Sequence, residues 1–291
     1  MCGLTRGEMV FQGFQMTEKK LEGRVAWVTG SSRGIGRVVA DHLASLGAKV
    51  AVHGTGPHST RAFNEADSLA QVATEISERH EADVVSVHGD LTDPYTVQSN
   101  FDEICDKLGP VDVLINNAGG DIGSTGTSGP NAGKPLVNDA LEVALEDVRT
   151  ILERNLMSCI LVCKAAVPSM IERNRGWIVT IGSIAGLTGH RSEVIYGTAK
   201  AAVHEYTKCL AAQLRPHGVY ANVIAPGEII TARFEASRPT REDRKVTAGP
   251  LTRYGWPIEV ARAVEFFVTS DSSYVSGQVL RVDGGAQLWP A

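Results

Sequence analysis

The chain has 291 residues, of which 43% are hydrophobic, and a formal net charge of -5 at pH 7. This length fits one large domain or two small ones, and the hydrophobic share is ordinary for a globular protein. The acidic balance argues against nucleic acid or an anionic membrane surface as a partner.

Residues 1–19 precede the first predicted strand and show no helical or strand period, so we expect an N-terminal extension there. The segment Met16-Thr17-Glu18-Lys19-Lys20 resembles a normal chain start, and residues 1–15 are interpreted as an upstream addition. No continuous apolar stretch occurs in the first twenty residues, and the one around Ile160 is interrupted by Lys164 and Pro168. Neither a signal peptide nor a membrane span is predicted, and a reducing cytoplasmic setting is the expectation.

Seven short β-rich runs alternate with helical patterns from residue 20 to the end, without an internal repeat or a linker. Most of the runs are apolar throughout, as in strands that are buried on both faces of a parallel sheet. The alternation predicts α/β architecture: a single doubly wound Rossmann-type domain, residues 20–291, with a seven-stranded parallel sheet flanked by helices. Ligands bind such sheets beyond the carboxyl ends of the strands. The predicted strands are 25–29, 49–53, 84–87, 111–115, 177–181, 220–224 and 279–282, and the predicted helices are 34–46, 64–80, 94–107, 141–173, 195–215 and 257–269.

A glycine-containing turn follows the first strand, in Thr29-Gly30-Ser31-Ser32-Arg33-Gly34-Ile35-Gly36. A strand, a glycine turn and a helix start together form a cradle for a pyrophosphate, because the helix N-terminus favours anions and glycines allow close backbone approach. The glycine spacing is not that of the G-x-G-x-x-G pattern, so a plain turn is the alternative for this segment taken alone.

Tyr196 and Lys200 lie one helical turn apart and share a helix face, thirteen and seventeen residues after Ser183. A free tyrosine has a pKa near ~10, and a nearby ammonium favours the phenolate; lowering that pKa to about 7 takes roughly 4 kcal/mol. With Ser183 donating a hydrogen bond to a carbonyl oxygen, the three groups could move a proton on or off an alcohol while a hydride moves elsewhere. A surface lysine beside a packed tyrosine is the alternative for this pair alone.

The two motifs in this order resemble the short-chain dehydrogenase/reductase family, and the resemblance runs from about Lys20 to Gly285. It implies that Tyr196 is the general acid or base, that Lys200 lowers its pKa and holds the nicotinamide ribose, and that Ser183 positions the carbonyl. Asn155 matches the fourth catalytic residue, which holds a water linked to Lys200. Further matches are Asn116-Asn117-Ala118-Gly119, Asp90, Pro226-Gly227 and Val282-Asp283-Gly284-Gly285. The implied cofactor-binding residues are Gly30, Ser32, Arg33, Gly34, Ile35, Gly36, Thr55, Asp90, Leu91, Asn117, Ala118, Gly119, Tyr196, Lys200, Pro226, Gly227, Ile229 and Thr231.

The end of the second predicted strand bears on the choice of cofactor. A carboxylate at this point would bind the ribose of NAD and repel a 2′-phosphate, but no acidic residue follows Val52 until Glu65. Arg33, Thr55 and Arg61 could hold the phosphate by charge-assisted hydrogen bonds. NADP(H) is therefore favoured and NAD(H) remains possible; a merely solvated Arg33 is the alternative.

Residues 119–139 form a glycine-rich insertion, since the distance from Gly119 to Asn155 is longer than is usual in the family. It is either a mobile surface loop or a flap over the pocket, because it leaves the carboxyl end of a strand. Residues 231–253 are the expected substrate lid. No metal site is predicted, because Cys159 and Cys163 lie one turn apart without a histidine at ligand spacing and are expected to be packed thiols.

Several charged residues lie in the loops that border the substrate pocket in this family. If they face inward, the substrate is polar: a sugar, a polyol or a hydroxy acid; otherwise they are solvated. A 3-oxoacyl-thioester reductase is the alternative enzyme, and a non-catalytic cofactor-binding sensor is an alternative that the intact Ser183, Tyr196 and Lys200 argue against. A homotetramer is expected from the resemblance and from the two long predicted helices. The charged loop residues are His190, Arg191, Glu193, Glu228, Arg233, Arg238, Arg241 and Arg244.

Overall fold

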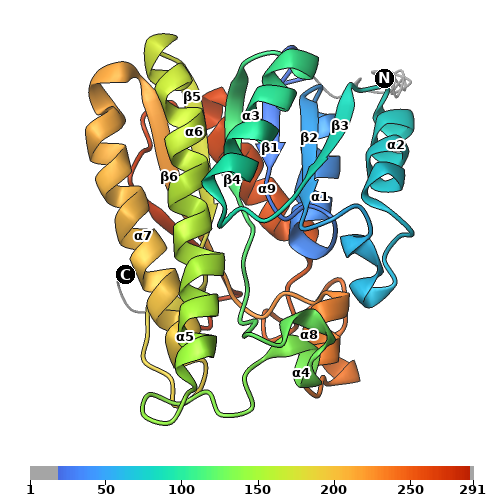
Figure 1. The fold of residues 1–291 in the computed structure, drawn as a ribbon, viewed down its shortest axis with the longest axis vertical. Coiled ribbons are helices and arrows are strands. Elements are labelled where there is room, and N and C mark those ends of the chain that lie inside the picture. The colour runs from blue at the N-terminus through green and yellow to red at the C-terminus, as the bar shows by residue number, and fades with distance from the viewer. Residues whose placement is uncertain (1–18, 289–291) are drawn as a thin grey trace, which may run out of the picture.

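The computed structural model describes residues 19–288, so the predicted extension, apart from Lys19, lies outside the described residues. Seven parallel strands form one sheet in the order β3-β2-β1-β4-β5-β6-β7 (Figure 1). This order reverses direction beside β1, as in a doubly wound sheet, and confirms the predicted fold class. The strands are β1 (Val25–Val28), β2 (Lys49–Gly54), β3 (Val84–His88), β4 (Val111–Asn116), β5 (Gly176–Ile181), β6 (Val219–Pro226) and β7 (Val279–Val282).

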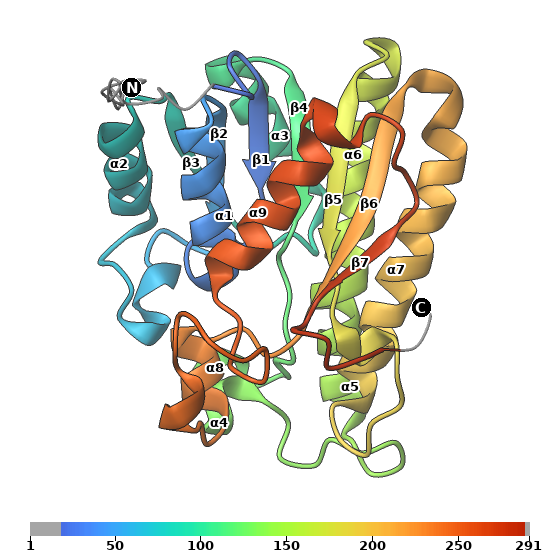
Figure 2. The same cartoon turned by 180° about the vertical axis from the view of Figure 1, so that it is seen from behind.

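Helices cover both faces of the sheet, and Figures 1 and 2 view the two faces from opposite sides. The side chains of β1 alternate between the layers: Val25 and Trp27 belong to one buried cluster, whereas Ala26 and Val28 belong to the other. All four are buried, which explains why this run is apolar throughout. One layer contains α1 (Gly34–Ser45), α2 (Leu69–His80) and α9 (Pro257–Val268), and the other contains α3 (Pro94–Leu108), α6 (Ser158–Glu172) and α7 (Val194–Leu214).

The predicted helix 64–80 begins later than expected, at Leu69. Ser68 caps this helix by accepting a hydrogen bond from the Gln71 amide. The residues before it form a 3-10 turn, η1 (Ser59–Phe63), which ends at Asn64 with a left-handed backbone (φ 55°). We call residues 55–68 the β2–α2 loop.

The predicted helix 141–173 also begins late, because the Asp139 carboxylate accepts the amides of Leu141 and Glu142 in a turn. It consists of α5 (Leu145–Leu152), a π-helical turn η3 (Glu153–Met157) and α6. By length and composition alone this continuous helix could cross a membrane, so Lys164 and Pro168 do not interrupt it as the sequence predicted. Its buried side chains, including Val162 and Met170, pack within the core beside α3 and β4.

Two short helical segments lie beyond the carboxyl ends of the strands, α4 (Pro130–Gly133) in the insertion and α8 (Ala232–Ser237) in the lid. They contact each other and cover the lower end of the sheet in Figure 1. This is the end where a ligand is expected. The remaining short turns are η2 (Gly126–Ser128), η4 (Ile184–Gly186), η5 (Arg215–His217), η6 (Glu242–Arg244) and η7 (Ser270–Ser272).

Candidate active site

A cleft of about 2440 Å³ runs along the carboxyl ends of the strands. Pockets for a single small ligand usually measure about 300–1,000 Å³, so this cleft has room for two molecules side by side. Every residue that the resemblance assigned to the cofactor lines it. These are Gly30, Ser32, Arg33, Gly34, Ile35, Gly36, Thr55, Asp90, Leu91, Asn117, Ala118, Gly119, Tyr196, Lys200, Pro226, Gly227, Ile229 and Thr231.

The glycine turn after β1 is tied to the loop after β4. The hydroxyl oxygen of Thr29 accepts hydrogen bonds from the amides of Asn117 (2.9 Å) and Ala118 (3.0 Å). The Asn117 side chain in turn donates to the carbonyls of Thr29 and Gly30, each at 3.0 Å. A Cβ atom at Gly36 would lie 2.4 Å from Asn117 Nδ2, so only glycine fits this contact.

His53, near the end of β2, is hydrogen-bonded to the glycine turn that follows β1. Burial lowers the pKa of its imidazole to about 4, so the ring is neutral near pH 7. Its Nδ1 accepts the Gly30 amide at 3.2 Å, and its Nε2 lies 3.1 Å from the Gly89 carbonyl. The neutral ring can satisfy both contacts only with its proton on Nε2. The sequence gave no reason to assign His53 a role.

The N-terminus of α1 holds an anion in this structure: the Glu65 carboxylate accepts the Gly34 amide at 2.9 Å. An internal carboxylate at this point shows that the turn can bind a negatively charged group, so the cradle fits a pyrophosphate. Arg33 lines the cleft, and its Nη1 donates to the Ser59 carbonyl at 2.7 Å. Arg61 is exposed, does not line the cleft and donates to the Asp67 carbonyl, so the prediction that it helps hold a phosphate is wrong.

The three predicted catalytic side chains meet at the other half of the cleft. Ser183 follows β5, and its hydroxyl oxygen accepts the Ala185 amide at 3.1 Å, which leaves the hydroxyl proton to be donated. Tyr196 and Lys200 lie on α7, with the ammonium nitrogen 5.7 Å from the centre of the phenol ring. The Ser183 hydroxyl is close enough to Tyr196 to lower the pKa of the phenol.

The expected lowering of the Tyr196 pKa by Lys200 is wrong for this structure. Burial raises the pKa of Tyr196 to about 12, because the phenolate loses its solvation. Burial also lowers the pKa of Lys200 to about 8, and its ammonium donates to the Ile181 carbonyl at 2.8 Å. Tyr196 is therefore a protonated phenol near pH 7, which suits a proton donor to a carbonyl oxygen.

Asn155 lies in the π-helical turn, a feature that is frequent at functional sites. Its amide is bonded to the start of the insertion: Oδ1 accepts the Gly120 amide and Nδ2 donates to the Gly120 carbonyl, both at 2.9 Å. A Cβ atom at Gly119 would lie 2.4 Å from Oδ1. A cavity of about 10 Å³, the size of one water molecule, is lined by Asn155, Ser158 and Lys200.

His204 was missed in the sequence. It lies one turn after Lys200 on α7, is buried, and accepts the Ser183 amide on Nε2 at 3.3 Å. Burial lowers its pKa to about 4, so the imidazole is neutral. It continues the four-residue spacing of Tyr196 and Lys200, and this spacing is the signal that could have identified it.

Charged side chains join three segments around Tyr196. Lys134 of the insertion forms an ion pair with Glu193, and Arg238 of the lid lies 3.4 Å from the same carboxylate. Arg233 donates to the Asp121 carbonyl at 2.6 Å. We call Asp121, Lys134, Glu193, Arg233 and Arg238 the charged frame. The insertion itself lines the cleft through Gly119, Gly120, Ile122, Gly126 and Thr127.

The remaining charged residues of the loops around the cleft lie outside the charged frame. His190, Glu228, Arg241 and Arg244 also line the cleft, whereas Arg191 does not. Arg241 pairs with Asp243 at 2.6 Å, and Arg244 pairs with Glu228 at 2.7 Å. Their charges are therefore balanced by their own neighbours.

The sheet, the glycine turn and the Ser183, Tyr196 and Lys200 group define the class of an α/β oxidoreductase with a dinucleotide site. A family model described as short chain dehydrogenase matches residues 24–242, and the chain belongs to this family. The chain is 37% identical over 273 residues to cyclohexanol dehydrogenase of Rhodococcus sp. (strain TK6), covering 91% of this chain and 96% of that protein. It is 34% identical over 270 residues to the 3-oxoacyl-acyl-carrier-protein reductase of Aquifex aeolicus, covering 92% and 99%.

A solved structure of 7α-hydroxysteroid dehydrogenase, complexed with NADH and 7-oxo glycochenodeoxycholic acid, has the same fold. It is 28% identical, gives a TM-score of 0.77, and covers 94% of this chain and 98% of its own. The family resemblance inferred from the motifs is thereby confirmed.

Proposed function

We propose that this protein interconverts a secondary alcohol and a ketone by hydride transfer with NAD(P), with Tyr196 as general acid or base. The observation that carries this proposal is the meeting of Ser183, Tyr196 and Lys200 in a cleft whose other half contains the glycine turn. A nicotinamide dinucleotide, when bound along the cleft, supplies or accepts the hydride. The chain's residues supply position, hydrogen bonds and the proton.

In the direction of reduction, Ser183 donates a hydrogen bond to the substrate carbonyl oxygen and fixes its position. Tyr196, which is protonated near pH 7, donates its proton to the oxygen as negative charge develops there. Lys200 has a lowered pKa, so its ammonium can readily donate a proton to the Tyr196 phenolate that remains. The cavity shared by Asn155 and Lys200 offers a place for a water that replaces this proton.

The charged frame supports a polar substrate: a sugar, a polyol or a hydroxy acid. Arg233 lines the cleft and interacts electrostatically with Tyr196, and only its Nη2 donates to the protein among residues 19–288. It forms no ion pair with a carboxylate within this range, whereas Lys134 and Arg238 both pair with Glu193. A half-buried guanidinium without a carboxylate partner favours a substrate that carries oxygen acceptors.

A 3-oxoacyl-thioester reductase is the second candidate, because the Aquifex relative carries this activity in its name. Such a substrate would have to pass its long thioester arm between the lid and the insertion. These two segments are tied together by the Arg233 contacts with Asp121 and Ala132. A cofactor-binding sensor without catalysis is the remote alternative. In such a protein Ser183, Tyr196 and Lys200 would have no role in proton transfer.

For the cofactor we propose NADP(H) as first choice and NAD(H) as alternative, since Arg33 and Thr55 line the cleft and no carboxylate terminates β2. We further propose a cytoplasmic homotetramer with a small-molecule substrate and with neither nucleic acid nor membrane as partner.

The test is a turnover panel with each reduced and oxidised cofactor, followed by nicotinamide absorbance. The panel contains hydroxy acids, polyols, cyclohexanol and a 3-oxoacyl thioester. We expect kcat/KM to be highest for a hydroxy acid or polyol. A higher value for the thioester would support the second candidate, and no turnover of any compound would support the sensor.

A further inference from the structure

The β2–α2 loop folds back over the end of β2 and brings an acidic residue to the cofactor half of the cleft. Ser59 covers the strand end so closely that a Cβ atom at Gly54 would lie 2.2 Å from its hydroxyl oxygen. His58, Ser59 and Glu65 of this loop all line the cleft, together with Arg33. In sequence Glu65 lies eleven residues after Gly54, but in the fold its carboxylate reaches the turn beside that strand.

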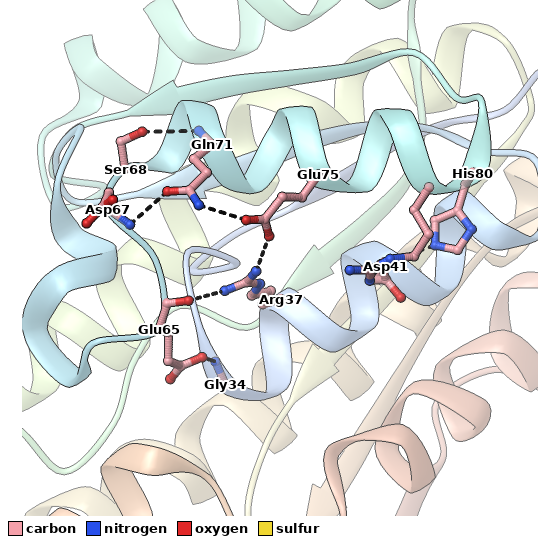
Figure 3. A network of polar contacts seen from close by, with 10 residues as sticks. Gly34, Arg37, Asp41, Glu65, Asp67, Ser68, Gln71, Glu75 and His80 are labelled. Carbon is pink, nitrogen blue, oxygen red and sulfur yellow. Dashed lines mark hydrogen bonds and ion pairs between the residues drawn. The ribbon is translucent and has the colours of Figure 1, made fainter.

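Glu65 is held in place by a network of side chains, drawn in Figure 3. Arg37 of α1 donates to the Glu65 carbonyl at 2.7 Å and pairs with Glu75 of α2 at 2.5 Å. Gln71 donates to Glu75 at 2.8 Å and accepts the Asp67 amide at 2.9 Å. The β2–α2 loop is thus hydrogen-bonded to both α1 and α2, and these contacts fix the position of Glu65.

One oxygen of the Glu65 carboxylate lacks a partner. Oε2 accepts the Gly34 amide, whereas Oε1 is buried and has no hydrogen-bond partner within residues 19–288. Buried polar atoms are nearly always paired in folded proteins, and an unpaired one calls for an explanation. A ligand hydroxyl in the cleft would satisfy Oε1 after a small movement of the side chain.

Arg33 lies beside Glu65 and has the opposite preference. Its guanidinium donates to the Ser59 carbonyl and is placed 5.1 Å from the Phe63 ring centre. Burial lowers the pKa of Arg33, and the negative charge of Glu65 offsets part of this effect. A 2′-phosphate at this point would be attracted by Arg33 and repelled by Glu65. A ribose with two free hydroxyls would be a donor to Glu65.

We propose that Glu65 selects between the cofactors: its carboxylate accepts hydrogen bonds from the adenosine ribose of NAD(H) and opposes the 2′-phosphate of NADP(H). The proposal rests on the proposed NAD(P)-dependent function and deepens it. Glu65 performs from the β2–α2 loop what a carboxylate at the end of β2 performs in other doubly wound sheets. Because Arg33 favours the phosphate and Glu65 opposes it at one site, the balance of the two charges sets how strongly the protein prefers NADP(H) over NAD(H).

The test measures dissociation constants of NAD⁺ and NADP⁺ for the wild type, Glu65→Gln and Glu78→Gln. Glutamine keeps an acceptor for the Gly34 amide but removes the charge. Glu78 is exposed on α2, so Glu78→Gln is a control with the same change of net charge. We expect Glu65→Gln to lower the dissociation constant of NADP⁺ relative to that of NAD⁺ by about tenfold. Glu78→Gln should leave the ratio of the two dissociation constants unchanged. Arg33→Ala should move the ratio toward NAD⁺.

An unchanged ratio in Glu65→Gln would overturn the proposal and leave Glu65 as a structural link to Gly34. An equal gain of affinity for both cofactors would also overturn it, because Glu65 would then be an internal anion that competes with the shared pyrophosphate. Glu65→Ala is the second variant, with the same expected direction, and thermal unfolding of each variant shows whether the loop has been lost. If the wild type binds neither dinucleotide, the proposed function fails as well, so the two failures are distinguishable.

Discussion

Lys134 of the insertion forms an ion pair with Glu193, which precedes α7 and lies three residues before Tyr196. The sequence left open whether the insertion is a mobile loop or a flap. The pair connects it to the start of α7, the helix that carries Tyr196. It is half-buried rather than exposed, so it is screened less by salt than a surface pair. The insertion is therefore held beside Tyr196 in the cleft.

The first prediction concerns this insertion. Shortening residues 121–138 to a glycine linker should raise KM or change the order of preferred substrates, because Asp121 and Lys134 of the charged frame are lost. The dissociation constant of the cofactor should stay nearly fixed, since Lys134 and Asp121 are bonded to Glu193 and Arg233, beside Tyr196, and not to the glycine turn after β1. Steady-state kinetics over the substrate panel and a cofactor titration check both parts. Unchanged kinetics would mean that the insertion is a tolerated surface segment.

The second prediction is that Tyr196→Phe abolishes turnover and leaves cofactor binding intact. Proton transfer by a positioned side chain typically contributes about 10²–10⁴-fold, and phenylalanine keeps the ring but removes the proton. Single-turnover and steady-state rates measure the loss. Retention of more than about a tenth of the wild-type kcat would contradict the assigned role. Tyr206→Phe, nearly three helix turns further along α7, is a matched control for loss of a tyrosine hydroxyl.

Arg233 provides the third prediction. Arg233→Gln should raise KM for hydroxy acids by about tenfold or more, since a charge-assisted hydrogen bond is replaced by a neutral one. The KM for cyclohexanol should change little, because cyclohexanol has no second oxygen to accept a hydrogen bond from Arg233. The matched control is Arg241→Gln, which removes an arginine that is already paired with Asp243. An equal rise for acidic and neutral substrates would show that Arg233 only holds the lid to the insertion.

The pH dependence of stability is the fourth prediction. The folded pKa of Lys200, about 8, lies below the unfolded value of 10.5, so between these values the unfolded chain binds more protons. Stability without cofactor should therefore rise with pH from about 8 and level off above 10.5, by at most about 3 kcal/mol. Below pH 8 the penalty for burying the charged lysine is fully present. The free energies of unfolding of the wild type and Lys200→Met, measured with denaturant over this pH range, isolate the contribution of Lys200. The same pH dependence in both proteins would contradict the prediction.

The fifth prediction is a homotetramer. Apolar side chains remain exposed in the first half of the long helix, at Leu145 and Met157, and in the turn before it, at Leu141. An apolar surface of this kind is typical of a subunit contact. Light scattering at micromolar concentration should give four times the chain mass of 31.1 kDa. A mass of one chain would refute the assembly.

The sequence predicted the parallel sheet and the meeting of Ser183, Tyr196 and Lys200 in one cleft, because apolar runs and short motifs act locally. Val25 to Val28 are buried on both sides, and this can be seen from composition alone. The four-residue spacing of Tyr196 and Lys200 fixes a common helix face before any fold is known.

What the sequence could not predict depends on contacts between distant residues. Glu65 lies eleven residues after Gly54, too far along the chain to be linked to the end of β2. The loop, which turns at Asn64 with a left-handed backbone, brings its carboxylate to the Gly34 amide. The pKa of Tyr196 was predicted in the wrong direction, because spacing along a helix says nothing of how deeply the phenol is buried. Both Arg33, in the glycine turn, and Arg61 were candidates for holding a phosphate, yet only Arg33 lines the cleft.

The π-helical turn at Glu153–Met157 makes Asn155 depend on the phase of its helix as well as on its identity. A turn of this type contains about one residue more than an α-helical turn, so it rotates everything before it relative to α6. Deleting a single residue from this turn would turn the Asn155 amide away from Gly120 while every motif in the sequence stayed intact. The spacing between Asn155 and α6 is thus as much a part of the site as the residues in it, and a chain with the right motifs but one residue fewer here would lose the site.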